Sequence, residues 1–213
     1  MTALEANARP DLGSTACSEQ GIVTLKVGPY GKAFLIHKSI LCAQSPYFRA
    51  ALVKGRWKEG QDNTIVLDET DPAVFSQLVV NWLYTGEVPE DLRDSLDAGY
   101  IFADRYDFPE LRAQIVEEVY FHYVARKQLL PSYKVIIQAF ENLPSTCKLC
   151  ELYVDLYGSR WYTKLDNEED AALREQLPAS FILPLLERLG EREIGGEGCD
   201  HDLSYYSEAY ISE

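Results

Sequence analysis

Residues 34–52 read FLIHKSILCAQSPYFRAAL, and their pattern determines the kind of fold that this chain can adopt. The first four residues are apolar or aromatic and are typical of a strand that ends at His37. Ser45-Pro46 places a capping side chain before a proline at the first helical position, so a helix begins there. Between the strand and this helix, Ile40 and Leu41 fit a short helix that directs both side chains inward.

The residues on either side of this stretch predict a small sheet. Residues 22–27 are rich in β-branched and aliphatic side chains, and residues 32–36 can pair with them across the turn Gly28-Pro29-Tyr30-Gly31. A third short strand is expected at residues 64–67. All elements after this point are predicted to be helical.

A second capped helix starts at Asp71-Pro72 and is predicted to end at Gly86, which can adopt a left-handed conformation. Its apolar residues recur at steps of three and four and predict a core helix: Val74, Phe75, Leu78, Val79, Trp82 and Leu83. Further helices are expected over residues 92–106, 109–126, 132–141, 146–161, 168–176 and 181–189. The fold class is therefore α+β, followed by an all-α extension.

Composition excludes several classes of function. The chain has 213 residues, 46% of them hydrophobic, which suffices for a sizeable core. Its net charge of −14 disfavours binding to nucleic acid or to anionic membranes. We find no apolar run of transmembrane length and no signal peptide. Five cysteines form a poor disulfide framework, so we expect an intracellular protein of the cytoplasm or nucleus.

The two ends of the chain are predicted to be tails. Residues 190–213 contain seven acidic side chains against one arginine, and such a segment buries too little surface to offset its ordering entropy. We expect the three tyrosines of this segment to be exposed: Tyr205, Tyr206 and Tyr210.

The motifs together resemble the BTB/POZ domain. They are His37-Lys38 with Leu41, Ser45 with Phe48, and the helix end Leu83-Tyr84-Thr85-Gly86, in the order that the family shows. The likeness implies a BTB/POZ-like helical cluster flanked by a small sheet at 21–125. Composition and helical periodicity add a flexible N-terminal tail at 1–20, a helical extension at 126–189 and an acidic flexible tail at 190–213. Residues 131–189 resemble the extension of many fungal members.

The resemblance implies a non-catalytic protein-protein interaction adaptor without cofactor or metal. Trp57-Lys58-Glu59 is similar to the hydrophobic-x-Glu element by which BTB adaptors bind a cullin ubiquitin-ligase scaffold, with Tyr106 as a second contact. An aromatic side chain on a loop can fill an apolar pocket while the glutamate satisfies polar groups at the rim. The alternative is that Trp57 covers the helices of its own domain.

BTB domains also self-associate, which implies a possible homodimer face at Leu35, Ile40 and Leu41; these residues could equally be core. The alternative function is a self-associating scaffold in a transcription or chromatin complex without cullin. Many members pair an Asp before the first strand with a basic helix residue. Gly21 stands at that position here, which puts a charged pocket with Arg49 in doubt.

Cys147-Lys148-Leu149-Cys150 invites a metal or redox interpretation. Zinc requires four ligands, and the nearest other candidates are Cys199 and His201 in the acidic tail. We favour buried cysteines that act as small hydrophobic side chains. An enzyme is the least favoured class, because the sequence has no catalytic triad pattern and no phosphate-binding loop.

Overall fold

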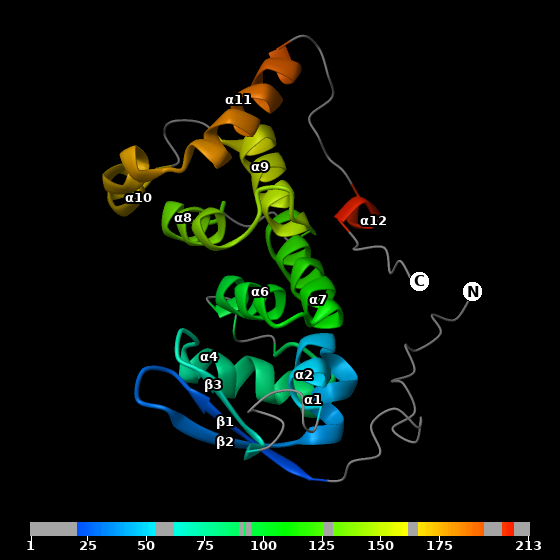
Figure 1. The fold of residues 1–213 in the computed structure, drawn as a ribbon. Helices are drawn as coiled ribbons and strands as arrows, with labels where there is room; N and C mark the ends of the chain where they lie inside the picture. Colours follow the sequence, from blue (N-terminus) through cyan, green and yellow to red (C-terminus); the bar gives the residue numbers. More distant parts are fainter. Residues whose placement is uncertain are drawn as a thin grey trace, which may run out of the picture. The chain divides into compact units, whose positions relative to one another are not determined.

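The computed structural model describes residues 21–53, 62–89, 92, 95–125, 130–161, 166–193 and 202–206 (Figure 1). The packing divides the chain into two compact units. The first comprises the described part of Met1–Pro89 together with Arg105–Glu110, and the second the described part of Glu90–Asp104 and Leu111–Glu213.

The first unit contains a three-stranded sheet of β1 (Ile22–Val27), β2 (Lys32–His37) and β3 (Thr64–Leu67), in the order β2-β1-β3. β1 pairs antiparallel with β2 and parallel with β3. The hairpin turn contains Gly28 and Gly31, both with positive φ, which confirms the predicted turn. Because side chains alternate along a strand, Val23, Leu25 and Val27 all enter the core.

Helices α1 (Lys38–Gln44) and α2 (Pro46–Ala51) follow β2 directly. The predicted caps are confirmed, since Ser45 Oγ accepts from the Phe48 amide at 3.1 Å and Asp71 Oδ1 accepts from the Ala73 amide at 2.6 Å. α4 (Pro72–Val74), η1 (Phe75–Val80) and α5 (Asn81–Thr85) form one continuous helix whose middle part is a π-helix. These helices lie on one side of the sheet (Figure 1).

Five of the six residues in the predicted core stripe of this long helix are buried, whereas Val74 is only partly buried; the buried five are Phe75, Leu78, Val79, Trp82 and Leu83. Gly86 ends the helix in the left-handed conformation. Trp82 packs edge-on against Phe108 with ring centroids 6.1 Å apart, and Phe75 packs against Phe34 at 4.9 Å.

The second unit is all-helical in its described part. Its elements are α6 (Leu96–Arg105), α7 (Pro109–Tyr120), the π-helical η3 (Phe121–Ala125), α8 (Tyr133–Asn142), α9 (Lys148–Arg160), α10 (Glu168–Leu173), η4 (Arg174–Gln176), α11 (Ala179–Glu193) and α12 (Leu203–Tyr206). The last residue of α6 and the first two residues of α7 belong to the first unit.

Helix α9 is the central element of this unit and packs against α8, α11 and α12. Every residue from Leu152 to Gly158 is buried. Gly158 permits the close approach of α11, because a Cβ at this position would lie 2.9 Å from Cβ of Arg188.

Two expectations for the acidic C-terminal segment are wrong. Part of it forms helix α12, and Tyr206 is only 2% exposed instead of lying in solvent. The reason is a specific partner: the Tyr206 hydroxyl donates to Asp155 Oδ2 on α9 at 2.6 Å. Tyr205 is exposed, and Tyr210 lies outside the described residues.

Among the helices that the structure describes, none combines the length and apolar character that crossing a membrane requires.

Candidate functional site

The predicted cullin contacts Trp57 and Glu59 lie outside the described residues, between Val53 and Asp62. The structure does describe the helix that leads into this segment. Helix α2 ends at Ala51, and the following Val53 is exposed. Helix α2 is therefore the described helix that precedes the Trp57 segment along the chain.

A cluster of aromatic rings supports the surface of α2. Tyr106 lies 5.4 Å from Tyr47 and 5.7 Å from Phe48, measured between ring centroids. Ser45 Oγ, besides capping α2, donates to the Tyr106 carbonyl at 2.6 Å and fixes this residue to the start of the helix. Burial raises the pKa of Tyr106 above its ordinary value, so the hydroxyl stays protonated at neutral pH.

The structure places Tyr106 under this surface and not on it. Tyr106 is 9% exposed, whereas its neighbour Tyr47 is 43% exposed. A partner that approaches this surface meets Tyr47 first, with Tyr106 as its support. Sequence reasoning missed Tyr47, although its position next to the buried Phe48 on a short helix indicates a residue at the margin of the core.

Arg49 is the basic residue of the charged pocket that the sequence put in doubt. In the structure it binds a backbone carbonyl. Its Nε donates to the Cys42 carbonyl at 3.0 Å and thereby ties α2 to α1. Gly21 offers no carboxylate at its own position, and its carbonyl accepts from the Lys38 amide at 2.9 Å. This arrangement stabilises the junction between β1 and the two helices.

The three predicted dimer residues differ in their burial. Leu35 points to the outer face of the sheet and is 66% exposed, Ile40 is partly buried, and Leu41 is fully buried in the core. Leu41 is therefore a core residue of this unit. The outer face also carries the exposed side chains of Ile22 and Val66, which sequence reasoning did not include.

His37 contacts Tyr84 at the junction between β2 and α1. Its Nδ1 lies 2.9 Å from the Tyr84 hydroxyl, and its amide donates to the same oxygen at 3.3 Å. Within the described ranges, no group of three or more His, Cys, Asp or Glu side chains could hold a metal ion.

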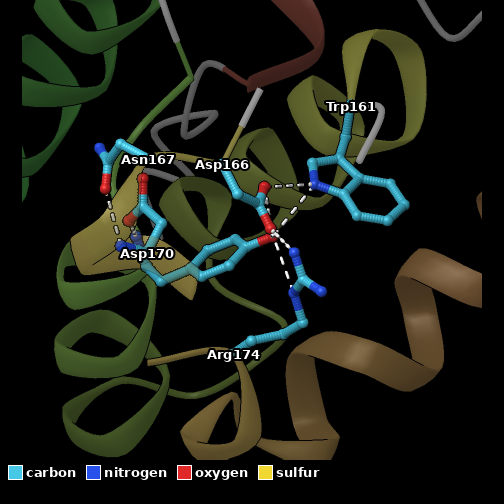
Figure 2. A network of polar contacts seen from close by, with 6 residues as sticks. Trp161, Asp166, Asn167, Asp170 and Arg174 are labelled. Carbon is cyan, nitrogen blue, oxygen red and sulfur yellow. Dashed lines mark hydrogen bonds and ion pairs between the residues drawn. The ribbon is translucent and has the colours of Figure 1, made fainter. Parts of the chain in front are cut away.

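In the second unit, Figure 2 shows a polar network centred on Asp166. Its carboxylate accepts hydrogen bonds from the Tyr133 hydroxyl at 3.0 Å, Trp161 Nε1 at 3.1 Å and Arg174 Nε at 3.1 Å. Burial alone would raise the pKa of Asp166, but these donors, Arg174 foremost, lower it below the ordinary value. Burial and the adjacent carboxylate raise the pKa of Tyr133 to about 12.

Two further side chains extend this network to the ends of helices. Asn167 Oδ1 accepts from the Asp170 amide at 2.8 Å and caps α10 (Figure 2). Asp170 Oδ1 accepts from the Tyr133 amide at 2.7 Å at the start of α8. The network therefore joins α8, the end of α9 and α10, and its observed bonds assign it a structural function.

The fold and the order of motifs define a protein-interaction module. Residues 20–122 match the family model of the BTB/POZ domain. The chain thus contains a BTB/POZ domain, and the resemblance found in the sequence is confirmed for this part.

Two of the three relatives below have a POZ or BTB domain in their names. The chain is 32% identical to TD and POZ domain-containing protein 4 of Mus musculus over 49% of its own length and 31% of that protein. It is 28% identical to Protein maternal effect lethal 26 of Caenorhabditis elegans, over 45% and 24% of the two chains, and 33% identical to Kelch repeat and BTB domain-containing protein 4 of Mus musculus, over 44% and 17%.

The matched region spans less than a third of each of these relatives. The similarity therefore defines the domain and not the activity of the whole protein. The likeness of residues 131–189 to fungal members stays a prediction.

Proposed function

We propose that this chain is an intracellular, non-catalytic adaptor whose BTB/POZ domain binds a cullin ubiquitin-ligase scaffold through α2 and the segment that contains Trp57 and Glu59. The observation that supports this proposal is a pair of exposed apolar side chains before this segment, Tyr47 on α2 and Val53 shortly after that helix. The resemblance of Trp57-Lys58-Glu59 to the hydrophobic-x-Glu element of BTB adaptors supplies the identity of the partner.

The proposed roles follow from the chemistry of the side chains. Trp57 fills an apolar groove on the cullin, and Glu59 accepts hydrogen bonds at its rim. Tyr47 adds apolar contact area next to this anchor. Because Ser45 and the ring of Tyr106 hold α2 in place, Tyr47 is ordered before binding, which lowers the entropy cost of association.

The experiment is a quantitative binding assay of the full chain against purified cullin N-terminal domains. Truncation of an anchor residue typically costs at least about 2 kcal/mol, so Trp57→Ala with Glu59→Ala should weaken binding by roughly 30-fold or more. Tyr30→Ala is the matched control, because Tyr30 is an aromatic residue of the same unit that is 98% exposed in the hairpin turn.

We expect the control to bind as the unmodified chain does and all variants to keep their melting temperature within a few degrees. Equal binding by the double variant, or no cullin binding by the unmodified chain, would reject the proposal.

A second candidate function rests on the outer face of the sheet. Ile22, Leu35 and Val66 expose apolar side chains there, which is consistent with a self-associating scaffold of a transcription or chromatin complex. Light scattering at micromolar concentration tests it: a mass near 24.2 kDa would reject a stable homodimer. If a dimer forms, Leu35→Glu should shift it to monomer. Enrichment in nuclear complexes that lack cullin would favour the scaffold over the adaptor.

A further inference from the structure

Cys147 and Cys150 occupy the first turn of α9. Cys147 is the residue before the helix, with an extended backbone of φ −74° and ψ 153°, and Cys150 is the third helical residue. Side chains three residues apart at this point lie on the same side of the helix, about 5–6 Å apart at Cβ. Both cysteines are free thiols; Cys147 is partly exposed and Cys150 is fully buried.

The two thiols differ in their environments. Hydrogen bonding from the Cys150 thiol and from the Tyr100 hydroxyl of α6 lowers the pKa of the Cys147 thiol. The amide N–H groups of Cys150 and Leu149 also lie beside it, at the positive end of the helix dipole.

These donors have opposite effects on the two thiols. Hydrogen bonding from Cys150 is the main cause that lowers the pKa of Cys147, because it stabilises the thiolate. The same bond, together with burial, raises the pKa of Cys150, because it leaves the proton on that sulfur. One thiol is therefore accessible and activated, and the other is buried and protonated within its reach.

We propose that Cys147 and Cys150 form a redox-active dithiol that exchanges with the disulfide of a low-molecular-weight thiol such as glutathione. This function is separate from partner binding by the BTB/POZ domain. The alternative interpretation, buried cysteines as inert core residues, does not account for the partial exposure of Cys147 at the start of a helix, one turn from a second free thiol.

The exchange takes place in two steps. The Cys147 thiolate attacks one sulfur of the disulfide, forms a mixed disulfide and releases the first small thiolate, which takes up a proton. Cys150 then attacks the Cys147 sulfur and gives its proton to the second small thiolate as that thiolate leaves, which forms the intramolecular disulfide and releases the second small thiol. Overall, two protein thiols are oxidised, one small disulfide is reduced, and two small thiols are formed.

The test uses the full chain with Cys17→Ser and Cys199→Ser. These changes remove the two cysteines that lie outside the described residues, so that neither can react in place of Cys147 and Cys150. The protein is equilibrated in buffers of reduced and oxidised glutathione, quenched with acid, alkylated and mapped by mass spectrometry. We expect the free thiols of Cys147 and Cys150 to disappear together, because the two residues form one intramolecular disulfide. Cys42, which is buried in the first unit, is the internal control and should remain reduced.

Two single variants separate the roles of the thiols. Cys150→Ser should trap the mixed disulfide of glutathione on Cys147, because the second step is removed. In Cys147→Ser, Cys150 should remain reduced. Its exchange with oxidised glutathione should be at least about tenfold slower than that of Cys147 in the chain that keeps both thiols. Circular dichroism melting establishes that both variants are folded.

The pH dependence of alkylation provides an independent measurement. Tyr100→Phe removes a donor to the Cys147 sulfur and should move the midpoint of its alkylation to higher pH. The proposal is overturned if no intramolecular disulfide forms at any glutathione ratio, or if Cys147 is alkylated at neutral pH no faster than cysteine in the denatured chain.

Discussion

Tyr206 provides a sharp test of whether the acidic C-terminal segment docks on α9. Its hydroxyl donates to Asp155, whose carboxylate also lies 2.8 Å from Nε of Arg188. Tyr206→Phe removes the hydroxyl while Arg188 continues to neutralise the carboxylate. Hydrogen bonds to charged groups contribute about 1.5–3 kcal/mol, so we expect a loss near the lower value, about 1.5 kcal/mol, in the free energy of docking.

This loss can be measured by amide hydrogen exchange. The Tyr205 amide donates to the Asp202 carbonyl at 3.2 Å at the start of α12, and it exchanges when the segment opens. A change of 1.4 kcal/mol is tenfold in an equilibrium constant, so exchange in Tyr206→Phe should be about tenfold faster. Tyr206→Ala also removes a buried ring, which costs about 3 kcal/mol or more, and should accelerate exchange roughly a hundredfold.

Tyr205→Phe is the matched control for this experiment. Tyr205 is the neighbouring tyrosine, is exposed, and lies with its ring 4.7 Å from the Lys148 ammonium, a contact that phenylalanine retains. Its exchange should stay within about twofold of the unmodified chain. Unchanged exchange in both Tyr206 variants would show that the segment is not held by this side chain, and the docking argument would be wrong.

Three further predictions concern the stability of each unit. Gly28→Ala should cost about 2–5 kcal/mol in urea unfolding, because φ is +77° and the new Cβ would lie 2.6 Å from Pro72; Gly31→Ala, where the nearest atom is 3.9 Å away, should cost only about 1–2 kcal/mol. Ser45→Ala removes a helix cap and a buried hydrogen bond and should cost about 2–3 kcal/mol; a loss below 0.5 kcal/mol would contradict this role. Asp166→Asn should destabilise the chain most at neutral pH. The pKa of Asp166 in the folded chain lies below its ordinary value of 3.8. The carboxylate therefore contributes to the free energy of unfolding above pH 3.8, and this contribution is lost as the pH falls through the folded pKa. The free energies of unfolding of Asp166→Asn and of the unmodified chain should converge below about pH 4.

The helix caps and the end of the long helix were predicted correctly from the sequence. Ser45-Pro46 and Asp71-Pro72 cap their helices as predicted, and Gly86 ends the long helix. These signals act between residues two to four positions apart, so tertiary packing changes them little. The π-helical turn within the long helix and the parallel pairing of β3 carry no comparable local signature.

Burial at the candidate sites was harder to predict. Leu41 and Leu35 are both aliphatic residues of the same motif, yet one is in the core and the other is on the outer sheet face. Tyr106 lies under Tyr47 because a hydroxyl 61 positions earlier in the chain binds its carbonyl. A sequence pattern indicates that a side chain is apolar, but its exposure depends on elements that are distant along the chain.

The amino-acid sequence by itself determined the strand and helix order, the helix caps, the BTB/POZ character of residues 20–122 and the interaction class of function, because these depend on local preference and on motif order. The tertiary structure alone decided that Tyr206 is buried against Asp155 and that Tyr47 packs against Tyr106. Each of these outcomes requires a partner on another element, and only the folded chain brings the two together.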